Sequence, residues 1–270
     1  MEEMVNGVAQ TWLITKVTLP GGQRADLLLR DGVIAKTGTR LAAAGPRRRL
    51  VMSFKTLAAT LAASPPPSHL ATRVIAVDGY SGAGKSFFAT RLATEMGAEY
   101  INTDDLVPGW TGLGDSVALL AEWVLEPITA GEAARWHRYD WELLRYTEWV
   151  DLAPCDTLVV DGCGAGHRSL APNLSWLVWV TAPAELRARR LPLRSDWEMY
   201  EPHVATWAAQ ERLLRASDDV AARADLVVDS GRTEAPSCPV SFDPEREFVY
   251  LDNGAWSAGS PRAAFSSNAR

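Results

Sequence analysis

The sequence has few of the residues that build metal centres and disulfide frameworks. Its 270 residues include four histidines and three cysteines, Cys155, Cys163 and Cys238, with no C-x-x-C spacing. An odd number of separated cysteines argues against a disulfide framework or a zinc site, and it favours a reducing, cytoplasmic location. No apolar run approaches the ~20 residues that a membrane-spanning helix needs, so we expect no membrane partner.

Positive charge is also scarce. The chain has 27 Lys and Arg residues against 33 Asp and Glu residues, a formal net charge of −6. Binding nucleic acid regardless of its sequence requires a basic face, so we expect no nucleic-acid partner. The hydrophobic content of 47% and the charged content of 22% are typical of a soluble globular protein. The length suits one ordinary α/β domain with extensions.

What the chain does contain is a glycine-rich loop between a predicted strand and a predicted helix. Residues 79–86 read Gly-Tyr-Ser-Gly-Ala-Gly-Lys-Ser, after the apolar, β-branched run 73–78. The apolar residues at 88, 89, 92 and 96 then share one helical face. The pattern G-x-x-x-x-G-K-[ST] in this context indicates a phosphate-binding loop, and the flanking strand and helix argue against a chance glycine-rich turn.

This loop predicts a bound nucleoside triphosphate, with ATP and Mg²⁺ as the cofactors. Backbone N–H groups of a curled loop converge on phosphate oxygens, and the N-terminus of the following helix adds partial positive charge. Lys85 would neutralise the outer phosphates, and Ser86 would offer its hydroxyl to Mg²⁺. The predicted nucleotide-binding residues are Gly79, Ser81, Gly82, Ala83, Gly84, Lys85, Ser86 and Phe87.

Apolar strands alternate with helical patterns along the middle of the chain. Strands are predicted at 73–78, 99–103, 157–161, 176–180 and 225–229, and helices at 117–125 and 202–217. This alternation predicts an α/β fold, a P-loop NTPase three-layer sandwich with a five-stranded parallel sheet. We expect this domain over 52–235, a strand-rich appendage or fusion remnant over 1–50, and a loosely ordered tail over 236–270.

Acidic residues follow two of the predicted strands, at the sheet edge where open α/β sheets bind ligands. Asp104 and Asp105 follow the second strand, and Asp161 ends the third. Asp104 could accept the proton of an attacking hydroxyl, Asp105 could contact the acceptor, and Asp161 could hold Mg²⁺ together with Ser86. Alternatively, the Asp pair begins a turn or caps a helix, and Asp161 forms a strand-end turn with Gly162.

Basic and aromatic residues offer two further candidate groups. Four arginines at 187, 189, 190 and 194 follow the fourth strand, and Arg190 and Arg194 flank an interruption suited to a lid that closes over the triphosphate. Such arginines on a surface helix can also be simply solvated. The chain has 11 tryptophans. A cluster at 136, 141 and 149 suits core or rim packing, or a pocket that stacks an aromatic base.

Four segments resemble uridine kinase and its relatives in the phosphoribulokinase/uridine kinase branch of the P-loop kinases. They are residues 78–86, 102–105, 138–141 and 158–162, and the resemblance covers roughly residues 70–232. It implies that Asp104 is the base, that Tyr139 and Asp140 line a nucleoside site, and that the arginine segment forms a lid. Two departures concern the substrate: Leu106 stands near the place of the family's aromatic residue, and Arg145 falls one place from its later arginine.

The first 50 residues carry a separate resemblance. Thr11–Ile14 and Ala25–Ala35 look like the opening β-strands of amidohydrolases, but the chain lacks the H-x-H pair and the length of their metal-binding barrel.

From the phosphate-binding loop and the kinase resemblance, we expect an ATP-dependent kinase that transfers the γ-phosphate to a hydroxyl of a small molecule, most plausibly a nucleoside. The alternative is a regulatory ATPase or a nucleotide-binding module without kinase activity. In each case, a homo-oligomer is a possible assembly of the protein.

Overall fold

The computed structural model describes residues 11–18, 24–30, 33–38, 49–52, 54–63, 65–232 and 248–252, and it describes side chains for 54–63 and 65–232. The chain divides into two units, Met1–Arg48 and Arg49–Arg270. In the first unit, β1 (Thr11–Thr18), β2 (Arg24–Arg30) and β3 (Val33–Gly38) form an antiparallel sheet in that order. The expected strand-rich N-terminal segment is confirmed.

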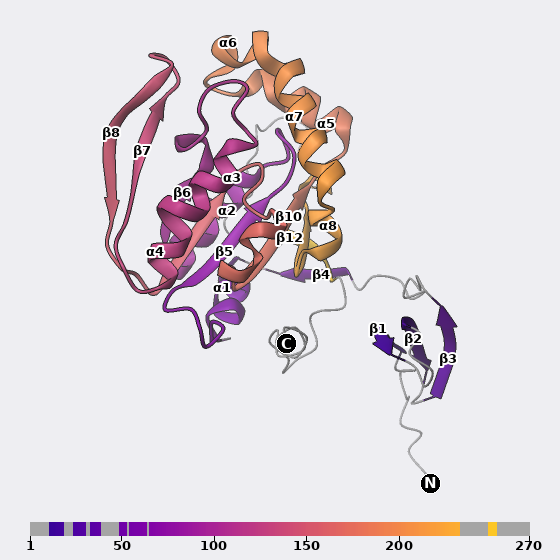
Figure 1. Ribbon diagram of the computed structural model, residues 1–270. Helices are drawn as coiled ribbons and strands as arrows, with labels where there is room; N and C mark the ends of the chain where they lie inside the picture. Colours follow the sequence, from indigo (N-terminus) through magenta and orange to yellow (C-terminus); the bar gives the residue numbers. More distant parts are fainter. Residues whose placement is uncertain are drawn as a thin grey trace. The chain divides into compact units, whose positions relative to one another are not determined.

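The second unit is built on the parallel strands that the apolar runs predict. Its parallel part has the order β11-β10-β5-β9-β6 (Figure 1). The bounds are β5 (Arg73–Asp78), β6 (Glu99–Asn102), β9 (Thr157–Asp161), β10 (Trp176–Thr181) and β11 (Leu226–Asp229). All five predicted strands are confirmed. The connection after β5 leads towards β6 on one side of the sheet, and the connection after β9 leads to β10 on the other side of β5. Open α/β sheets bind ligands at the carboxyl ends of the strands where the connections diverge in this way.

Two antiparallel strands extend this sheet beyond β11. β12 (Phe248–Asp252) pairs with β11, and β4 (Arg49–Met52) pairs with β12. Neither strand follows from the sequence patterns. The rest of the predicted tail, 236–270, lies outside the described residues.

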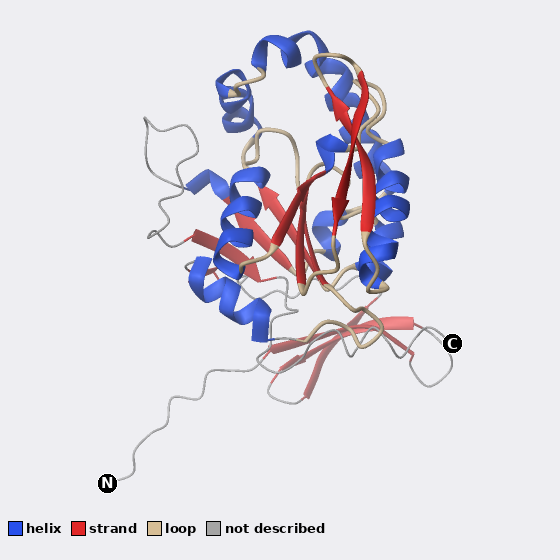
Figure 2. Ribbon diagram, turned by 90° about the vertical axis from the view of Figure 1, so that its left-hand side faces the viewer, coloured by secondary structure: helices blue, strands red, loops and turns tan. Residues whose placement is uncertain are grey.

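Helices cover both faces of the parallel sheet. Side chains alternate along β5, so Val74 and Ala76 enter one apolar cluster and Ile75 and Val77 enter the other. The cluster of Ile75 and Val77 includes α1 (Phe54–Ala63) and α2 (Lys85–Met96). The opposite cluster includes a helical run and α8, so helices lie on both sides of the sheet (Figure 2). The bounds there are α3 (Asp115–Leu120), the π-helical turn Ala121–Leu125, α4 (Glu126–Thr129) and α8 (Val220–Arg223).

These layers make the unit the α/β three-layer sandwich with a five-stranded parallel sheet that the sequence predicts. Each large apolar side chain that the clusters bury stabilises the fold by roughly 1.5–3 kcal/mol relative to an exposed one. The sandwich thereby supplies a rigid base for the loops at the carboxyl edge of the sheet.

Two elements lie outside the three layers. A hairpin of β7 (Ala134–Asp140) and β8 (Arg145–Leu152) lies beside the sandwich in Figure 1. A helical segment follows β10, made of α5 (Ala184–Arg190), α6 (Trp197–Tyr200) and α7 (Val204–Ser217). A third apolar cluster, which includes Val107, Leu113, Cys163, Tyr200 and Trp207, joins the loop after β6 to α6 and α7.

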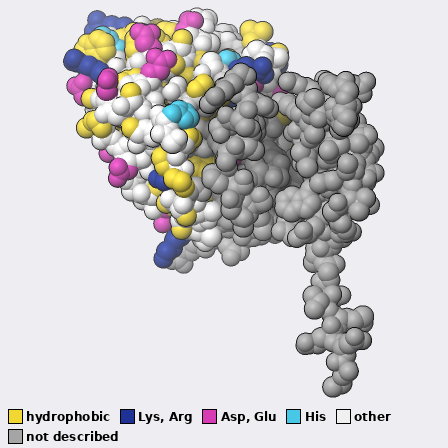
Figure 3. Space-filling model, turned by 60° about the horizontal axis from the view of Figure 1, so that its bottom comes forward, with side chains coloured by type: hydrophobic (Ala, Val, Ile, Leu, Met, Phe, Trp, Pro, Cys, Tyr) yellow, Lys and Arg dark blue, Asp and Glu magenta, His cyan; other side chains and the backbone are white. Residues whose placement is uncertain are grey.

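No described helix has the length and apolarity to cross a membrane. On the face in Figure 3, the described acidic and basic side chains are interspersed instead of gathering by sign.

Candidate active site

The loop after β5 has the backbone that its glycines predict. Gly82 and Gly84 have φ angles of +76° and +91°, which side chains rarely tolerate. A Cβ atom at Gly79 would lie 2.2 Å from the carbonyl oxygen of Val180 on β10. Glycine is therefore required at Gly79 for the loop to approach β10, and α2 begins directly after the loop at Lys85. The N-terminus of α2 thus points its free N–H groups at the loop.

A cavity of about 190 Å³ opens beside this loop. Ser81, Lys85 and Ser86 line it from the loop, and Asp104 and Asp105 line it from the short 3₁₀ helix η1 (Thr103–Asp105) after β6. Of the other predicted loop residues, Phe87 packs against the apolar cluster of α1 and α2. The cavity therefore brings Lys85, the predicted phosphate-binding lysine, and Asp104, the predicted base, together.

Lys85 is surrounded by acidic groups. Its Nζ donates to the carbonyl oxygen of Tyr80 at 3.2 Å and to Sγ of Cys163 at 3.4 Å. Burial lowers the pKa of Lys85, but the acidic groups around it, Cys163, Asp161, Glu211 and Asp78, more than offset this and raise the pKa above its usual value. Lys85 is therefore a fixed positive charge at the loop, as neutralising phosphate oxygens requires.

Asp161 ends β9 as a fully buried carboxylate. Its Oδ2 accepts a hydrogen bond from the Tyr100 hydroxyl at 3.1 Å, while its buried Oδ1 has no hydrogen-bond partner. Burial raises the pKa of Asp161 to about 6, although Lys85 and Ser86 act in the opposite direction. An unpartnered buried carboxylate oxygen beside a serine hydroxyl fits a hard cation such as Mg²⁺.

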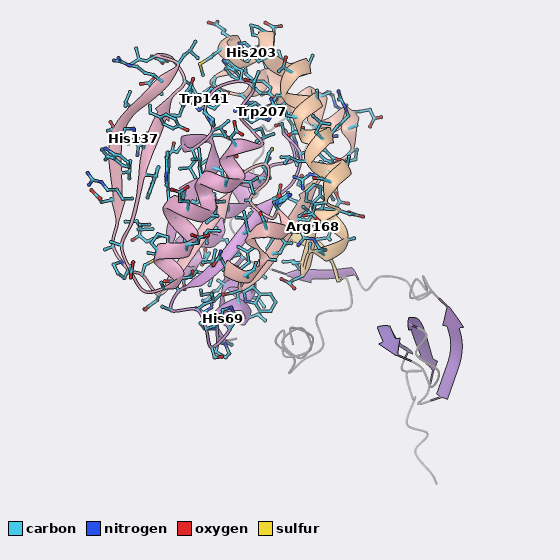
Figure 4. All side chains as sticks on the ribbon, viewed as in Figure 1. His69, His137, Trp141, Arg168, His203 and Trp207 are labelled. Carbon is cyan, nitrogen blue, oxygen red and sulfur yellow. The ribbon has the colours of Figure 1, made fainter. Side chains whose placement is uncertain are left out.

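This site lacks the ligands to hold a metal ion by itself. No group of three or more His, Cys, Asp and Glu side chains suited to a metal occurs among the residues that the structure describes. Three of the histidines, His69, His137 and His203, lie far apart in Figure 4. Mg²⁺ usually keeps several waters and shares its remaining positions with substrate phosphates, so a sparse protein ligand set agrees with this metal.

Asp104 is held by η1 at the cavity wall. The Asn102 side chain accepts from the backbone N–H of Asp104 at 2.8 Å and caps this short helix. Burial raises the pKa of Asp104, against the lowering effect of Arg194 and Lys85. A raised pKa makes the carboxylate a stronger base. Burial also raises the pKa of the neighbouring Asp105, which lies 3.5 Å from the Arg138 guanidinium.

The two predicted lid arginines have different surroundings. Arg194 lines the cavity and makes a bidentate ion pair with Asp196, at 2.7 and 2.6 Å, which raises its pKa. Arg190 instead donates to the hydroxyl and carbonyl oxygens of Ser230, both at 2.9 Å, behind the phosphate loop. Arg194 therefore lies at the cavity, whereas Arg190 contacts Ser230 and does not line the cavity.

The predicted acceptor residues on the hairpin lie beside the cavity wall. Tyr139 packs against Trp141 with ring centroids 5.1 Å apart, and Trp141 lines the cavity. Asp140 accepts from the backbone N–H groups of residues 142 and 143 at 2.9 and 2.8 Å, so it shapes the turn of the hairpin. Neither Tyr139 nor Asp140 is among the described side chains that line the cavity.

Aromatic residues that the sequence patterns did not single out complete the wall. Trp110, Tyr200 and Trp207 line the cavity with Trp141. Ring centroids are 4.6 Å apart for Trp110 and Trp141 and 5.9 Å for Trp141 and Trp207, and Trp141 and Trp207 lie close together in Figure 4. The abundance of tryptophan was the available signal, but the rings come from three segments whose meeting no local pattern encodes.

A second group of residues supports the loop. Asp78 at the end of β5 accepts from the N–H of Gly79 at 2.6 Å and from that of Gly166 at 2.9 Å, and it pairs with Arg215 at 2.6 Å. Asp78 is therefore a structural tie between the phosphate loop and the loop after β9. Glu211 accepts from the N–H of Ser81 at 2.7 Å.

The chain has distant structural similarity to solved kinases and no match by sequence. No family model and no curated protein matches it. A structure described as a possible uridine kinase from Bacillus stearothermophilus has 17% identity and a TM-score of 0.48, covering 64% of this chain and 96% of its own. A shikimate kinase from Bacteroides thetaiotaomicron has 15% identity and a TM-score of 0.38, covering 61% and 90%. TM-scores this low carry no information about the reaction.

Proposed function

We propose that this protein is a kinase that transfers the γ-phosphate of ATP to a hydroxyl of a small molecule, most plausibly a nucleoside. The observation that carries the proposal is one shared cavity, lined by Lys85 and Ser86 from the phosphate loop and by Asp104 opposite them. Phosphoryl transfer needs positioning and charge neutralisation, and these residues can supply both.

In the proposed reaction, the acceptor hydroxyl oxygen attacks the γ-phosphorus while the bond from that phosphorus to the β–γ bridging oxygen breaks. The hydroxyl proton passes to Asp104, the phosphate ester forms and ADP leaves. Lys85 and the loop N–H groups neutralise the charge that develops on the phosphate oxygens, and Arg194 can add a cation from the other side of the cavity. The raised pKa of Asp104 favours this proton transfer.

Ser86 and Asp161 are the residues that would hold Mg²⁺. The unpartnered Oδ1 of Asp161 supports this assignment. The metal ion would screen the negative charge of the phosphates when bound. Without the metal ion, the Ser86 hydroxyl and the Lys85 charge lower the pKa of Asp161, against the larger effect of burial.

The wall of the cavity supports an acceptor with a flat ring. Trp110, Trp141 and Trp207 present indole rings there, and aromatic faces stack well on planar heterocycles. Asp105 and Asp196 add carboxylates that can accept hydrogen bonds from ring N–H or sugar hydroxyl groups. A nucleoside combines these features, with a base to stack and a ribose hydroxyl to phosphorylate.

A coupled ADP-release assay across nucleosides, sugars and vitamins tests this function. We expect release to be slow with Mg·ATP alone and to rise at least tenfold with an acceptor that carries a flat ring. Release at the same rate with and without every acceptor would instead indicate a regulatory ATPase. Nucleotide binding with no release would indicate a binding module.

A further inference from the structure

Helix α7 presents three side chains to the site at intervals of four residues, Trp207, Glu211 and Arg215. Residues at this spacing share one helical face. Trp207 lines the cavity, Glu211 accepts from the N–H of Ser81, and Arg215 pairs with Asp78 at the base of the loop. One face of a single helix therefore lines the cavity, binds the phosphate loop at Ser81, and pairs with Asp78, which holds the start of that loop.

Glu211 is the central residue of this face, and its side chain is buried, with an exposed fraction of 5%. Its Oε1 accepts from the N–H of Ser81 at 2.7 Å and from Sγ of Cys163 at 3.1 Å. The Cys163 sulfur in turn accepts from Nζ of Lys85 at 3.4 Å. Glu211 thus fixes one backbone N–H of the loop directly and reaches the phosphate-binding lysine through one thiol.

Electrostatic attraction to the nucleotide cannot explain a carboxylate at this place. A triphosphate bound at the loop would repel the Glu211 charge, and a carboxylate removed from water is costly without compensation. What Glu211 offers is an acceptor oxygen at a fixed point for the Ser81 N–H and for the Cys163 thiol, whose other acceptor is the carbonyl oxygen of Gly79 at 3.4 Å. Its charge stabilises the Lys85 ammonium, but its contribution to the shape of the loop is one of geometry.

We propose that Glu211 is a positioning residue whose carboxyl oxygen holds Ser81 and, through Cys163, Lys85 in the arrangement that receives the triphosphate. This inference rests on the proposed function, because it assumes that the loop binds ATP. Helix α7 also carries Trp207, so the same rigid element joins the acceptor cavity to the nucleotide loop.

Two uncharged variants of similar size separate geometry from charge. Glu211→Gln keeps an acceptor oxygen and removes the repelling charge, whereas Glu211→Met removes both the charge and the oxygen. We expect Glu211→Gln to bind Mg·AMP-PNP at least as tightly as the unaltered protein. We expect Glu211→Met to bind it about tenfold more weakly, because the Ser81 N–H loses its partner and the loop its fixed position.

The experiment is isothermal titration of Mg·AMP-PNP into the full chain and each variant, with melting temperatures recorded alongside. Glu185→Gln on α5 is the matched control, since Glu185 is exposed and its replacement removes the same charge from a different helix. The control should bind within twofold of the unaltered protein. If Glu211→Met does not fold, Glu211→Leu takes its place.

Three results would overturn the inference while leaving the proposed function standing. Equal weakening in both variants would indicate packing, equal strengthening would indicate charge alone, and unchanged affinity in Glu211→Met would remove the role altogether. By contrast, if the unaltered protein fails to bind Mg·AMP-PNP, the proposed function fails and this inference with it.

Discussion

At the scale of single residues, we propose different tasks for Asp104 and Asp161 because their neighbours differ. Asp104 lines the cavity, with Arg194 and Lys85 as its main positive neighbours. Asp161 lies wholly buried, with a tyrosine hydroxyl on one oxygen and no partner on the other. In our proposal, Asp104 exchanges a proton with the acceptor and Asp161 helps to hold Mg²⁺.

Replacing Asp104 by Asn should lower kcat with the true acceptor by about 10²–10⁴, because a neutral amide cannot take the hydroxyl proton. The affinity for Mg·AMP-PNP should stay within about threefold, since Asn keeps the size of the side chain. Steady-state kinetics and titration on the same preparation measure both quantities. Asp105→Asn is the contrast, with the main effect expected on the KM of the acceptor. An unchanged kcat in Asp104→Asn would show that another group is the base.

The ionised form of Asp161 should lower the free energy of unfolding, so its effect should depend on pH. Its pKa is raised to about 6 from an ordinary value of 3.8, so the folded protein binds more protons than the unfolded chain between these values. The free energy of unfolding should therefore rise as the pH falls from about 7 towards 4. Without Mg²⁺ at pH 8, Asp161→Asn should be more stable than the unaltered protein by up to about 3 kcal/mol, and this difference should shrink by pH 4.

Urea denaturation at both pH values measures this difference, with Asp156→Asn, an exposed change of the same kind, as the control. Activity should respond in the opposite direction. The metal ion and the proton compete for Asp161, so turnover should fall as the pH drops below about 6. A loss of stability in Asp161→Asn at pH 8 would contradict the account of Asp161 as a carboxylate whose ionisation is opposed by burial.

At the scale of elements, the turn after β6 and the turn after β9 depend on each other. A Cβ atom at Gly162 would lie 1.7 Å from Oγ1 of Thr103 and 2.9 Å from its Cβ, and Thr103 begins the short helix that carries Asp104. Glycine at 162 also has a φ of +150°, which other residues rarely adopt. The close approach of these two turns therefore fixes where Asp104 lies.

Gly162→Ala should displace η1 and lower kcat by at least about tenfold, since small misplacements of catalytic groups are costly. The control is Gly97→Ala at the C-terminus of α2, where φ is +59° but no atom lies within 4 Å of the added Cβ. Both variants carry backbone strain of about 1 kcal/mol or more, so both should melt a few degrees lower. Only Gly162→Ala should lose turnover, and equal kinetics in the two would refute the coupling of the turns.

Most elements could be predicted because their signals are local. The run 157–161 is apolar and β-branched and forms β9 over the same residues, and the glycines of 79–86 dictate their own loop. The hairpin of β7 and β8 was not predicted, since residues such as Arg135, His137 and Glu148 interrupt the apolar alternation of a buried strand. The meeting of Trp110, Trp141 and Trp207 depends on tertiary packing, and the same holds for Glu211 against Ser81.

At the scale of the whole molecule, every side chain assigned to the site lies in the unit Arg49–Arg270. A chain that lacks residues 1–48 should therefore fold and bind Mg·AMP-PNP within about twofold of the full chain. Removing residues 1–52 instead also deletes β4, which pairs with β12, and this chain should melt at a lower temperature. Titration and thermal melting compare the three chains. Loss of binding in the shorter deletion would mean that the first unit contributes to the site.

The central claim is that the γ-phosphate of ATP is transferred to an alcohol and not to water. This requires the cavity to place the hydroxyl of the acceptor next to the γ-phosphate. The most direct measurement follows the label of [γ-³²P]ATP in the presence of a deproteinised pool of small metabolites. We predict that the label enters an organic phosphate ester, that it does so only with the pool present, and that Asp104→Asn abolishes the transfer. Release of the label as inorganic phosphate, at one rate with or without the pool, would contradict this account.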